Sequence, residues 1–545
     1  MRAFLAWLLV GCVPTDAPDP PLTDDTHVIA STVPVTIEWG EARTCLDPGQ
    51  RDTRWFSPTP LLDNEPILED ELPFLDGGGL AVGDVDGDHV LDLVLPARDD
   101  RTALYLGRGD GSFIPATERL PATSTHVASA TLVDLEGDGD LDLVLSAFEQ
   151  PNQWLINDGT GTFTDITETL DLGFPPDLPT MNTSFADVDQ DGDLDAFVAV
   201  YGPIPEDNAF TTENAVPSLF FENVSETGPA FLDRTEAFVP ADHPLQQGHT
   251  FQGAWIDADL DGDVDLYAVN DFGTEVPSQL FTNDAGTLTW VSGMGLDLPH
   301  NNMGVSWGDL NQDGTLDLLV TAWDVLGLMV TEGSSWFNVS QAWGVVPDRT
   351  NGRHVGWGSL LEDVDNDGDL DAFVAYGQLV EAGTAGNTYD QPDGLYVQQQ
   401  PQVFEQQAEQ HGVAHPGANR GALLVDLNDD GWLDLLVRDL RGPTQIHLGQ
   451  CGTNSWTKVE LVGADANPFA IGATIHIEQG DTSMVRSLQA GGSSYLCSTP
   501  PEVHVGLGEA TRIERLTVVW PDGARSTFGD LPINRTLTIH RQVER

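Results

Sequence analysis

The chain has 545 residues, with 87 Asp and Glu against 22 Lys and Arg, so its formal net charge is −65. Nucleic-acid phosphates are bound mainly by Lys and Arg, so this charge excludes a nucleic-acid partner held by basic patches. It also disfavours adsorption to anionic membranes, which needs polybasic segments. Because 40% of the residues are apolar and come in strand-like bursts, we expect a folded chain rather than the disorder that such acidity often brings.

The N-terminus has the order of a secretory signal: a positive start, the apolar run 4–10, and then Gly11-Cys12. The ending resembles the bacterial lipobox, in which the cysteine is lipidated. We therefore expect residues 1–12 to be a lipoprotein-type signal peptide with lipidation at Cys12. The chain would then be exported and anchored at the bacterial cell envelope or outer membrane. An ordinary signal peptide, and hence secretion, is the alternative.

Residues 13–49 are rich in Pro and Asp at their start and are predicted to be a tether and lead-in. No later stretch has the roughly 18 uncharged apolar residues of a membrane-spanning helix, so membrane contact is expected only through the anchor. Export permits disulfides. Cys451 and Cys497 are the predicted pair, which would leave Cys45 as a free thiol, and the cysteines show no zinc-site spacing.

The central feature is an acidic nonapeptide that recurs seven times between residues 84 and 434. Positions 1 and 3 hold Asp84 and Asp86, Asp134 and Glu136, Asp187 and Asp189, Asp257 and Asp259, Asp309 and Asn311, Asp363 and Asp365, and Asp426 and Asn428. Positions 5 and 9 hold Asp88 and Asp92, Asp138 and Asp142, Asp191 and Asp195, Asp261 and Asp265, Asp313 and Asp317, Asp367 and Asp371, and Asp430 and Asp434. Position 7 holds Val90, Asp140, Asp193, Asp263, Thr315, Asp369 and Trp432.

Oxygen ligands at positions 1, 3, 5 and 9 of a tight loop suit a hard cation such as Ca²⁺, which takes six to eight oxygens. A backbone carbonyl at position 7 would complete the set, which explains why that side chain varies. Position 6 is glycine in every copy but the first, as a left-handed turn requires, and His89 is expected to be strained there. The loops with His89 and Glu136 are predicted to be the weakest of up to seven Ca²⁺ sites.

The competing interpretation is an EF-hand, which needs flanking helices and a glutamate at position 12. Here position 12 is apolar, as in Leu95 and Val198, and each loop is followed by a short apolar strand. A second strand pair with a Gly/Asn/Asp turn follows most loops, for example over residues 104–113 and 154–163. Four short strands per repeat make one propeller blade. The sequence therefore predicts an all-β, seven-bladed β-propeller.

These repeats resemble the FG-GAP/VCBS repeats of integrin α-subunit propellers and of many bacterial secreted proteins. The resemblance covers roughly residues 50–450 and implies Ca²⁺ held in the loops by the residues at positions 1, 3, 5 and 9. After Cys451 the acidic loops stop, and strands are expected over 456–462, 473–478, 516–520 and 536–540. Residues 451–545 are thus predicted to form a small β-sandwich or barrel. The segments 470–473, 504–508 and 519–523 resemble the ASPIC/UnbV domain.

Two functions of different classes are compatible with these patterns. The first is a non-enzymatic, Ca²⁺-binding cell-surface propeller that binds an extracellular protein or glycan, with no catalytic residues. The second is a Ca²⁺-dependent polysaccharide lyase or hydrolase with its site in the propeller channel. Polar residues that could line that channel are His249, His300, Asn301, Asn302, Arg353 and His354, although hydrogen bonding between blades is the interpretation we favour for them. Fold alone does not choose between the two.

Overall fold

The structure is a computed structural model. It describes residues 13–14, 27–44, 54–58, 78–97, 102–173, 175, 177–203, 215–225, 228–238, 248–349, 352–378, 390–463, 466–480 and 482–542. The predicted signal peptide, the lipidation site Cys12 and the thiol of Cys45 lie outside these residues.

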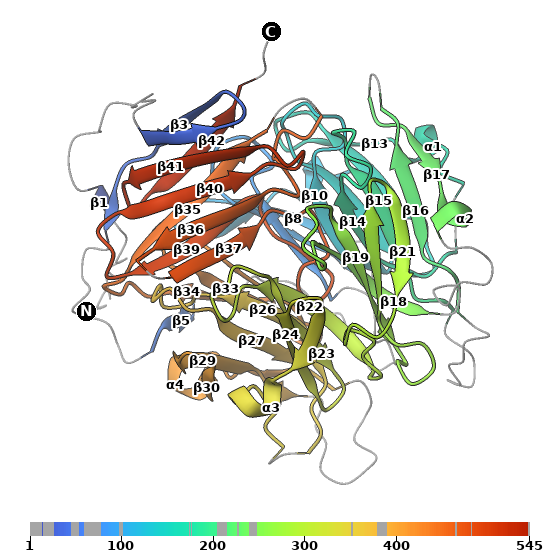
Figure 1. The fold of residues 1–545 in the computed structure, drawn as a ribbon. Coiled ribbons are helices and arrows are strands. Elements are labelled where there is room, and N and C mark those ends of the chain that lie inside the picture. The colour runs from blue at the N-terminus through green and yellow to red at the C-terminus, as the bar shows by residue number, and fades with distance from the viewer. Residues whose placement is uncertain are drawn as a thin grey trace, which may run out of the picture.

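Seven antiparallel four-strand units follow one another along the chain and form the blades of a propeller (Figure 1). Blades 1 to 3 are β6 (Leu80–Gly83), β7 (Asp92–Leu95), β8 (Ala103–Gly107) and β9 (Phe113–Pro115); β10 (Val127–Val133), β11 (Asp142–Ala147), β12 (Gln153–Asn157) and β13 (Phe163–Asp165); and β14 (Thr180–Ala186), β15 (Asp195–Val200), β16 (Leu219–Asn223) and β17 (Phe231–Asp233). Blades 4 and 5 are β18 (His249–Ile256), β19 (Asp265–Asp271), β20 (Gln279–Asp284) and β21 (Thr287–Val291); and β22 (Asn302–Gly308), β23 (Asp317–Ala322), β24 (Leu326–Glu332) and β25 (Ser335–Asn338). Blade 6 is β26 (Gly356–Glu362), β27 (Asp371–Tyr376), β29 (Gly394–Gln400) and β30 (Val403–Gln406).

Blade 7 is completed by a strand from the other end of the chain. It consists of β32 (Asn419–Val425), β33 (Asp434–Asp439) and β34 (Gln445–Gly449), and its outer strand is β5 (Phe56–Pro58). The first strand of each blade also contacts the first strand of the next blade, and β32 contacts β6, so the ring is closed. The predicted seven-bladed propeller is confirmed, and the pairing of β5 with β34 joins the N-terminal part of the chain to the last blade by main-chain hydrogen bonds.

Short elements complete the blades. A turn of helix follows the fourth strand in several of them: η2 (Thr117–Arg119), α1 (Thr167–Leu170), α2 (Thr235–Phe238), α3 (Ser340–Trp343) and α4 (Ala408–His411). A two-residue pair, β28 (Gln391–Pro392) with β31 (Pro416–Gly417), links blades 6 and 7. The first and second strands are almost wholly buried, because each blade packs between two neighbours, and the outer strands alternate between buried and exposed.

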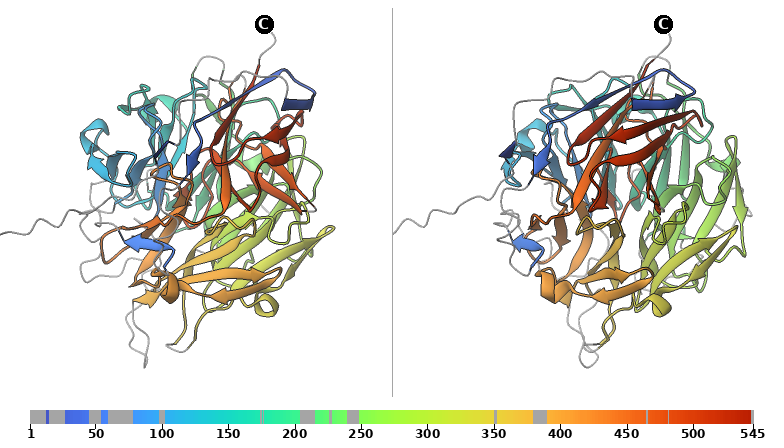
Figure 2. Two further views of the ribbon diagram at one scale, coloured as in Figure 1. Left: turned by 90° about the vertical axis from the view of Figure 1, so that its left-hand side faces the viewer. Right: turned by 60° about the vertical axis from the view of Figure 1, so that its left-hand side comes forward.

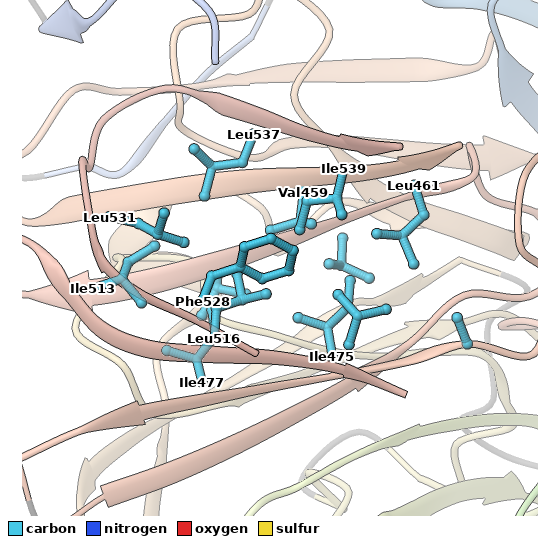
Figure 3. Close-up of a cluster of buried hydrophobic side chains, with 14 of the residues drawn as sticks. Val459, Leu461, Ile475, Ile477, Ile513, Leu516, Phe528, Leu531, Leu537 and Ile539 are labelled. Atoms are coloured by element: carbon cyan, nitrogen blue, oxygen red, sulfur yellow. The ribbon is translucent and has the colours of Figure 1, made fainter. Parts of the chain in front are cut away.

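The C-terminal part is a β-sandwich, as expected. One sheet has the order β2-β41-β40-β36-β37 and the other β3-β42-β35-β39. The strands are β2 (Val28–Ser31), β3 (Val35–Trp39), β35 (Ser455–Val462), β36 (Thr474–Gln479), β37 (Thr482–Ser487), β39 (Glu502–Gly508), β40 (Ile513–Val519), β41 (Arg525–Leu531) and β42 (Thr536–Arg541). Ile475, Leu516, Phe528 and Ile539 are fully buried between the sheets and belong to the core shown in Figure 3.

The N-terminal lead-in differs from the prediction of a tether. Residues Val28–Ser31 pair with β41, and Val35–Trp39 pair with β42, so both segments are edge strands of the C-terminal sandwich. Val35 and Ile37 face its core, while Thr36 and Glu38 alternate with them. Within the same lead-in, the short strand β1 (Val13–Pro14) pairs antiparallel with the short strand β4 (Arg43–Thr44). The lead-in therefore ties the start of the chain to its end, as the blue and red ribbons in Figure 2 show.

A segment of the C-terminal domain fills the channel of the propeller. This channel segment, Ala490–Ser498, includes β38 (Cys497–Ser498), which pairs in parallel with β6 of blade 1. Its other contacts reach the remaining blades in turn. They are Ser498 Oγ with the amide of Leu132, Ala490 with Phe185, Gly492 with the side chain of Gln252, Ser494 with Val305, the Tyr495 ring with Trp357, and the thiol of Cys497 beside Gly421. Tyr495 and Leu496 are fully buried in an apolar cluster that draws on several first strands.

The predicted disulfide between Cys451 and Cys497 is wrong. Cys497 is a free, fully buried thiol in β38, and its Sγ lies 3.1 Å from the carbonyl oxygen of Tyr495. Cys451 is disulfide-bonded, so its partner is another cysteine. The prediction failed because it assumed that two cysteines of one domain must be neighbours, whereas the channel segment carries Cys497 away from its own sandwich and into the ring.

Ring closure can be tested at Phe56 in β5, which is 2% exposed and packs in the core between blades 6 and 7. We expect Phe56→Ala to lower the free energy of unfolding by about 3–5 kcal/mol, because it leaves a cavity. The measurement is denaturant unfolding. Phe337→Ala, on an outer strand where the ring is 52% exposed, is the control and should cost far less. Equal effects of the two changes would contradict closure by β5.

Candidate metal centre: seven acidic loops on one face

Each acidic loop joins the first strand of its blade to the second. The residue before position 1 pairs with the aspartate at position 9, as in Gly83 with Asp92 and Val425 with Asp434. All seven loops therefore lie on the same face of the ring, and we number them with their blades. The predicted strand–loop–strand arrangement is confirmed in every copy, and none of the seven has the flanking helices of an EF-hand.

The loops share one internal hydrogen-bond pattern. In all seven, the position 1 carboxylate accepts the backbone N–H of position 6 at 2.7 to 3.2 Å. In all seven, the position 5 carboxylate accepts the N–H of position 7 at 2.9 to 3.3 Å. These bonds fix the orientation of the position 1 and position 5 carboxylates relative to the backbone of the turn.

The aspartate at position 9 is the most constrained member. One of its oxygens accepts the N–H of position 2 at 2.8 to 3.2 Å. The other accepts an N–H from the third strand of the blade at 2.7 to 2.9 Å. The side chain thus joins the loop to two strands besides offering its remaining lone pairs to an ion. The sequence predicted this residue as a ligand but did not reveal its bonds to the loop and the third strand.

Burial shifts the pKa of these aspartates upward. Loss of solvent raises the pKa of Asp142, Asp195 and Asp317 to about 8, although their backbone hydrogen bonds act in the opposite direction. The pKa of Asp92 and of Asp265 rises to about 7 for the same reason. A carboxylate in such a place is costly unless a positive charge lies beside it. A cation in the loop would supply that charge.

In four loops, three carboxylates come together with oxygen atoms within 4.8 Å of one another. These are Asp84, Asp86 and Asp92 in loop 1; Asp187, Asp189 and Asp191 in loop 3; Asp257, Asp259 and Asp265 in loop 4; and Asp363, Asp365 and Asp371 in loop 6. Oδ1 of Asp86, of Asp187 and of Asp259 is buried without a hydrogen-bond partner among the described residues. Unpartnered, converging carboxylate oxygens are the donor set of a hard cation, so these residues fit Ca²⁺.

The two loops predicted to be weakest do deviate, in different ways. In loop 1, His89 at position 6 has φ +64°, the left-handed conformation expected to strain it, and Arg119 places a guanidinium nitrogen 3.2 Å from Oδ2 of Asp86. This loop still brings three carboxylates together. In loop 2, repulsion from neighbouring acids and burial, which is the larger cause, raise the pKa of Glu136.

Position 4 of the loops has a role that the sequence did not reveal. All seven residues there have a positive φ: Gly87, Gly137, Gln190, Leu260, Gln312, Asn366 and Asp429. Three of them reach the next loop of the ring. The carboxamide of Gln190 donates to Asp263, that of Gln312 donates to Asp369 Oδ1 at 2.7 Å, and that of Asn366 donates to the carbonyl oxygen of Gly431 at 2.8 Å. The Asp side chains at position 7 of loops 4 and 6 thus serve as acceptors between loops.

The sandwich rests on the loop face. Arg43 pairs with Asp429 of loop 7 at 2.5 Å, and Lys458, the chain's one lysine, lies 3.5 Å from the same carboxylate. His504 Nε2 lies 2.7 Å from Oδ1 of Asn366 in loop 6. Trp456 packs against Gly431 so closely that a Cβ there would lie 1.8 Å from the indole. The loops are therefore a contact surface between the two domains as well as a candidate metal centre.

The polar residues considered for a channel site lie at the opposite end of the first strands. His249 is buried, with Nδ1 2.5 Å from the carbonyl oxygen of Tyr201 in blade 3, and Asn302 donates to Ser278 Oγ in blade 4 at 3.0 Å. His249 and Asn302 therefore make contacts between neighbouring blades, as we expected from the sequence. His300 and Arg353 are exposed. The structure does not gather these residues around an open channel, because the channel segment occupies the centre of the ring.

The comparisons with known proteins agree with this architecture. The FG-GAP-like repeat family matches residues 84–145, 134–198 and 257–320, and the ASPIC and UnbV family matches residues 463–545. The chain is thus a β-propeller of FG-GAP-like repeats followed by an ASPIC/UnbV domain. Both resemblances drawn from the sequence are confirmed.

Its curated relatives include cartilage acidic protein 1 of Mus musculus, which is 26% identical over 269 residues, and that of Xenopus tropicalis, 27% identical over 276 residues. Each match covers 48% of this chain and 40% of the relative, so the chain spans less than half the length of either. Among solved structures, BP39L lectin from Burkholderia pseudomallei is similar at a TM-score of 0.43 and 12% identity over 70% of this chain and 98% of the lectin. A lectin of Agrocybe aegerita is similar at a TM-score of 0.38 and 15% identity, over 66% of this chain and 88% of the lectin.

Within the part of the chain that the structure describes, no helix has the length and apolar character needed to cross a bilayer.

The contact between loop 7 and the sandwich can be tested with a glycine pair. Gly431 and Gly262 both occupy position 6 with positive φ, but only Gly431 has a neighbour at Cβ distance. Alanine at either position should cost about 1–3 kcal/mol of backbone strain. Gly431→Ala should cost about 1–3 kcal/mol more, because it also displaces Trp456. Denaturant unfolding measures both changes, and equal losses would argue against the packing of Trp456 on loop 7.

Proposed function

We propose that this protein is an exported, Ca²⁺-binding propeller that acts at the cell surface as a non-enzymatic binding module for an extracellular protein or glycan. The observation that carries the metal part is the convergence of carboxylate oxygens in the acidic loops, some of them buried and unpartnered. Oxygen ligands of this kind and number are those of Ca²⁺. Up to seven ions are expected, one for each loop.

In this proposal the aspartates at positions 1, 3, 5 and 9, with their Asn and Glu counterparts, hold the ion together with the backbone carbonyl of position 7. The ion supplies positive charge to carboxylates that burial has deprived of solvent. Its effect is to join the end of the first strand, the turn and the start of the second strand. Because the position 9 aspartate also bonds the third strand, each ion would stiffen a whole blade.

Binding without catalysis is supported by the way in which the centre of the ring is used. The alternative, a Ca²⁺-dependent polysaccharide lyase or hydrolase, would place its site in the channel. The fully buried side chains of Tyr495 and Leu496 fill that space, so it is occupied by packed apolar groups. Export and anchoring at Cys12 are supported by the order of residues 1–12.

The metal sites are tested by removing the ion. We expect chelation to lower the melting temperature, because an ion bound only to the folded state stabilises it by about 2.7 kcal/mol per site at a hundredfold excess over Kd. Native mass spectrometry should count up to seven ions per chain. A melting temperature that is the same with chelator and with millimolar Ca²⁺ would contradict the proposal.

A single variant tests the assignment of ligands. Asp259→Ala removes position 3 of loop 4 and should lower the ion count by one, since the remaining oxygens are too few for tight binding. Glu332→Ala, an exposed acidic residue at the end of β24, is the matched control and should leave the count unchanged. If both variants keep the wild-type count, Asp259 is not a ligand.

A further inference from the structure

The face of the propeller opposite the acidic loops carries a polar pocket at blade 6. The pocket has a volume of about 590 Å³, within the range of small-molecule sites. His354 comes just before β26, Tyr376 ends β27, and Asp393 comes just before β29, so these residues lie at the ends of the strands remote from loop 6. Asp348 and Glu409 also line the pocket.

The floor of the pocket is built from buried polar groups held in place by the fold. Asp393 is 1% exposed, and its carboxylate accepts the backbone N–H of Tyr376 at 2.8 Å and the amide of Asn419 at 2.9 Å. The hydroxyl of Tyr396 donates to the carbonyl oxygen of Val346 at 2.9 Å, so Tyr376, 3.0 Å away, donates to Tyr396. The oxygen of Tyr376 keeps its acceptor capacity.

One buried group of the pocket lacks a partner. His354 is 3% exposed, and its Nδ1 has no hydrogen-bond partner among the described residues. Burial lowers the pKa of this imidazole, so the ring is neutral near pH 7. A buried polar atom without a partner costs free energy that a ligand hydrogen bond would recover.

The chemistry of the wall selects the ligand class. It combines the carboxylates of Asp348 and Glu409 with the carboxamides of nearby glutamines and with the carboxyl group of Asp393, whose pKa burial raises well above its usual value. Among the described residues that line the pocket there is no Lys or Arg side chain. Phosphates and uronic acids would meet like charge there. Carboxylates accept from hydroxyl groups, and carboxamides both donate and accept, so a ring bearing several hydroxyls can satisfy both.

We propose that this pocket binds a non-acidic sugar residue, neutral or amino, of an extracellular glycan. The proposal rests on the binding function proposed above and gives it a place, remote from the acidic loops and outside the channel. Asp348 and Glu409 lie at the exposed rim, where they can meet the sugar. Asp393, His354 and Tyr376 form the floor.

The test is an array of neutral, amino and uronic oligosaccharides probed with the full chain in millimolar Ca²⁺, followed by calorimetry on the best glycan. We expect binding to neutral or amino sugars and not to uronic ones. Asp348→Ala and Glu409→Ala should each weaken it about tenfold or more, the value of a hydrogen bond to a charged group. Glu168→Ala is the control, because Glu168 is the second residue of α1 as Glu409 is of α4, and it should bind as wild type.

The outcomes separate this site from the function on which it rests. If the wild type binds sugars and both rim variants bind them equally well, the pocket is refuted while glycan binding stands. A preference for uronic sugars would refute the ligand class. If the array shows no binding at all, the pocket and the glycan half of the proposed function both fail, and capture of a protein partner then tests the other half. Melting temperatures of the rim variants verify that their fold is intact.

Discussion

The architecture depends on a stretch of chain that belongs to one domain and lies within the other. The channel segment leaves the sandwich, crosses the centre of the propeller and contacts every blade before it returns. Its aromatic and aliphatic side chains fill the space where the seven first strands meet, so the two domains share an apolar core at that point. Burial of this kind is the dominant favourable term in folding. The ring and the sandwich are therefore expected to unfold together rather than as separate units.

The same arrangement determines which acidic residues of the loops contact the sandwich. The seven loops concentrate carboxylates on one face, and the sandwich covers part of that face with Arg43, Lys458 and His504. Bound cations, residues of the sandwich and bonds from position 4 of neighbouring loops would then act on the same turns. A change in loop 3, 5 or 6 should affect the next loop of the ring, and a change in loop 6 or 7 should affect the docking of the sandwich. Part of the net charge of −65 comes from the acidic residues of these loops.

The two faces of the propeller consequently differ in what they offer a partner. The loop face is partly covered by the sandwich, and the channel is filled by the segment that crosses it. The opposite face carries the pocket at blade 6, whose polar floor is fixed by Asn419 and by the backbone of Tyr376. Ligand sites on rigid scaffolds generally lie where connections between strands leave room, and this face is made of such connections.

The sequence by itself determined the parts of the structure that repeat over short distances. Each blade is a set of neighbouring hairpins, so the acidic loop and the turn after it were enough to predict seven blades and the strand–loop–strand geometry. The alternation in the C-terminal strands predicted a sandwich for the same local reason. Val35-Thr36-Ile37-Glu38-Trp39 alternates too, and this signal could have revealed the strand that a Pro- and Asp-rich context concealed.

Only the tertiary structure decided what joins residues far apart in the chain. The pairing of β5 with β34, of the lead-in with the sandwich, and of β38 with β6 each brings together segments separated by hundreds of residues. No local pattern encodes such partners, because they follow from which surfaces remain unpaired once the blades have formed. The mistaken disulfide of Cys497 and the unforeseen bonds of position 4 have this same physical origin: both depend on a neighbour that the ring, and not the local sequence, supplies.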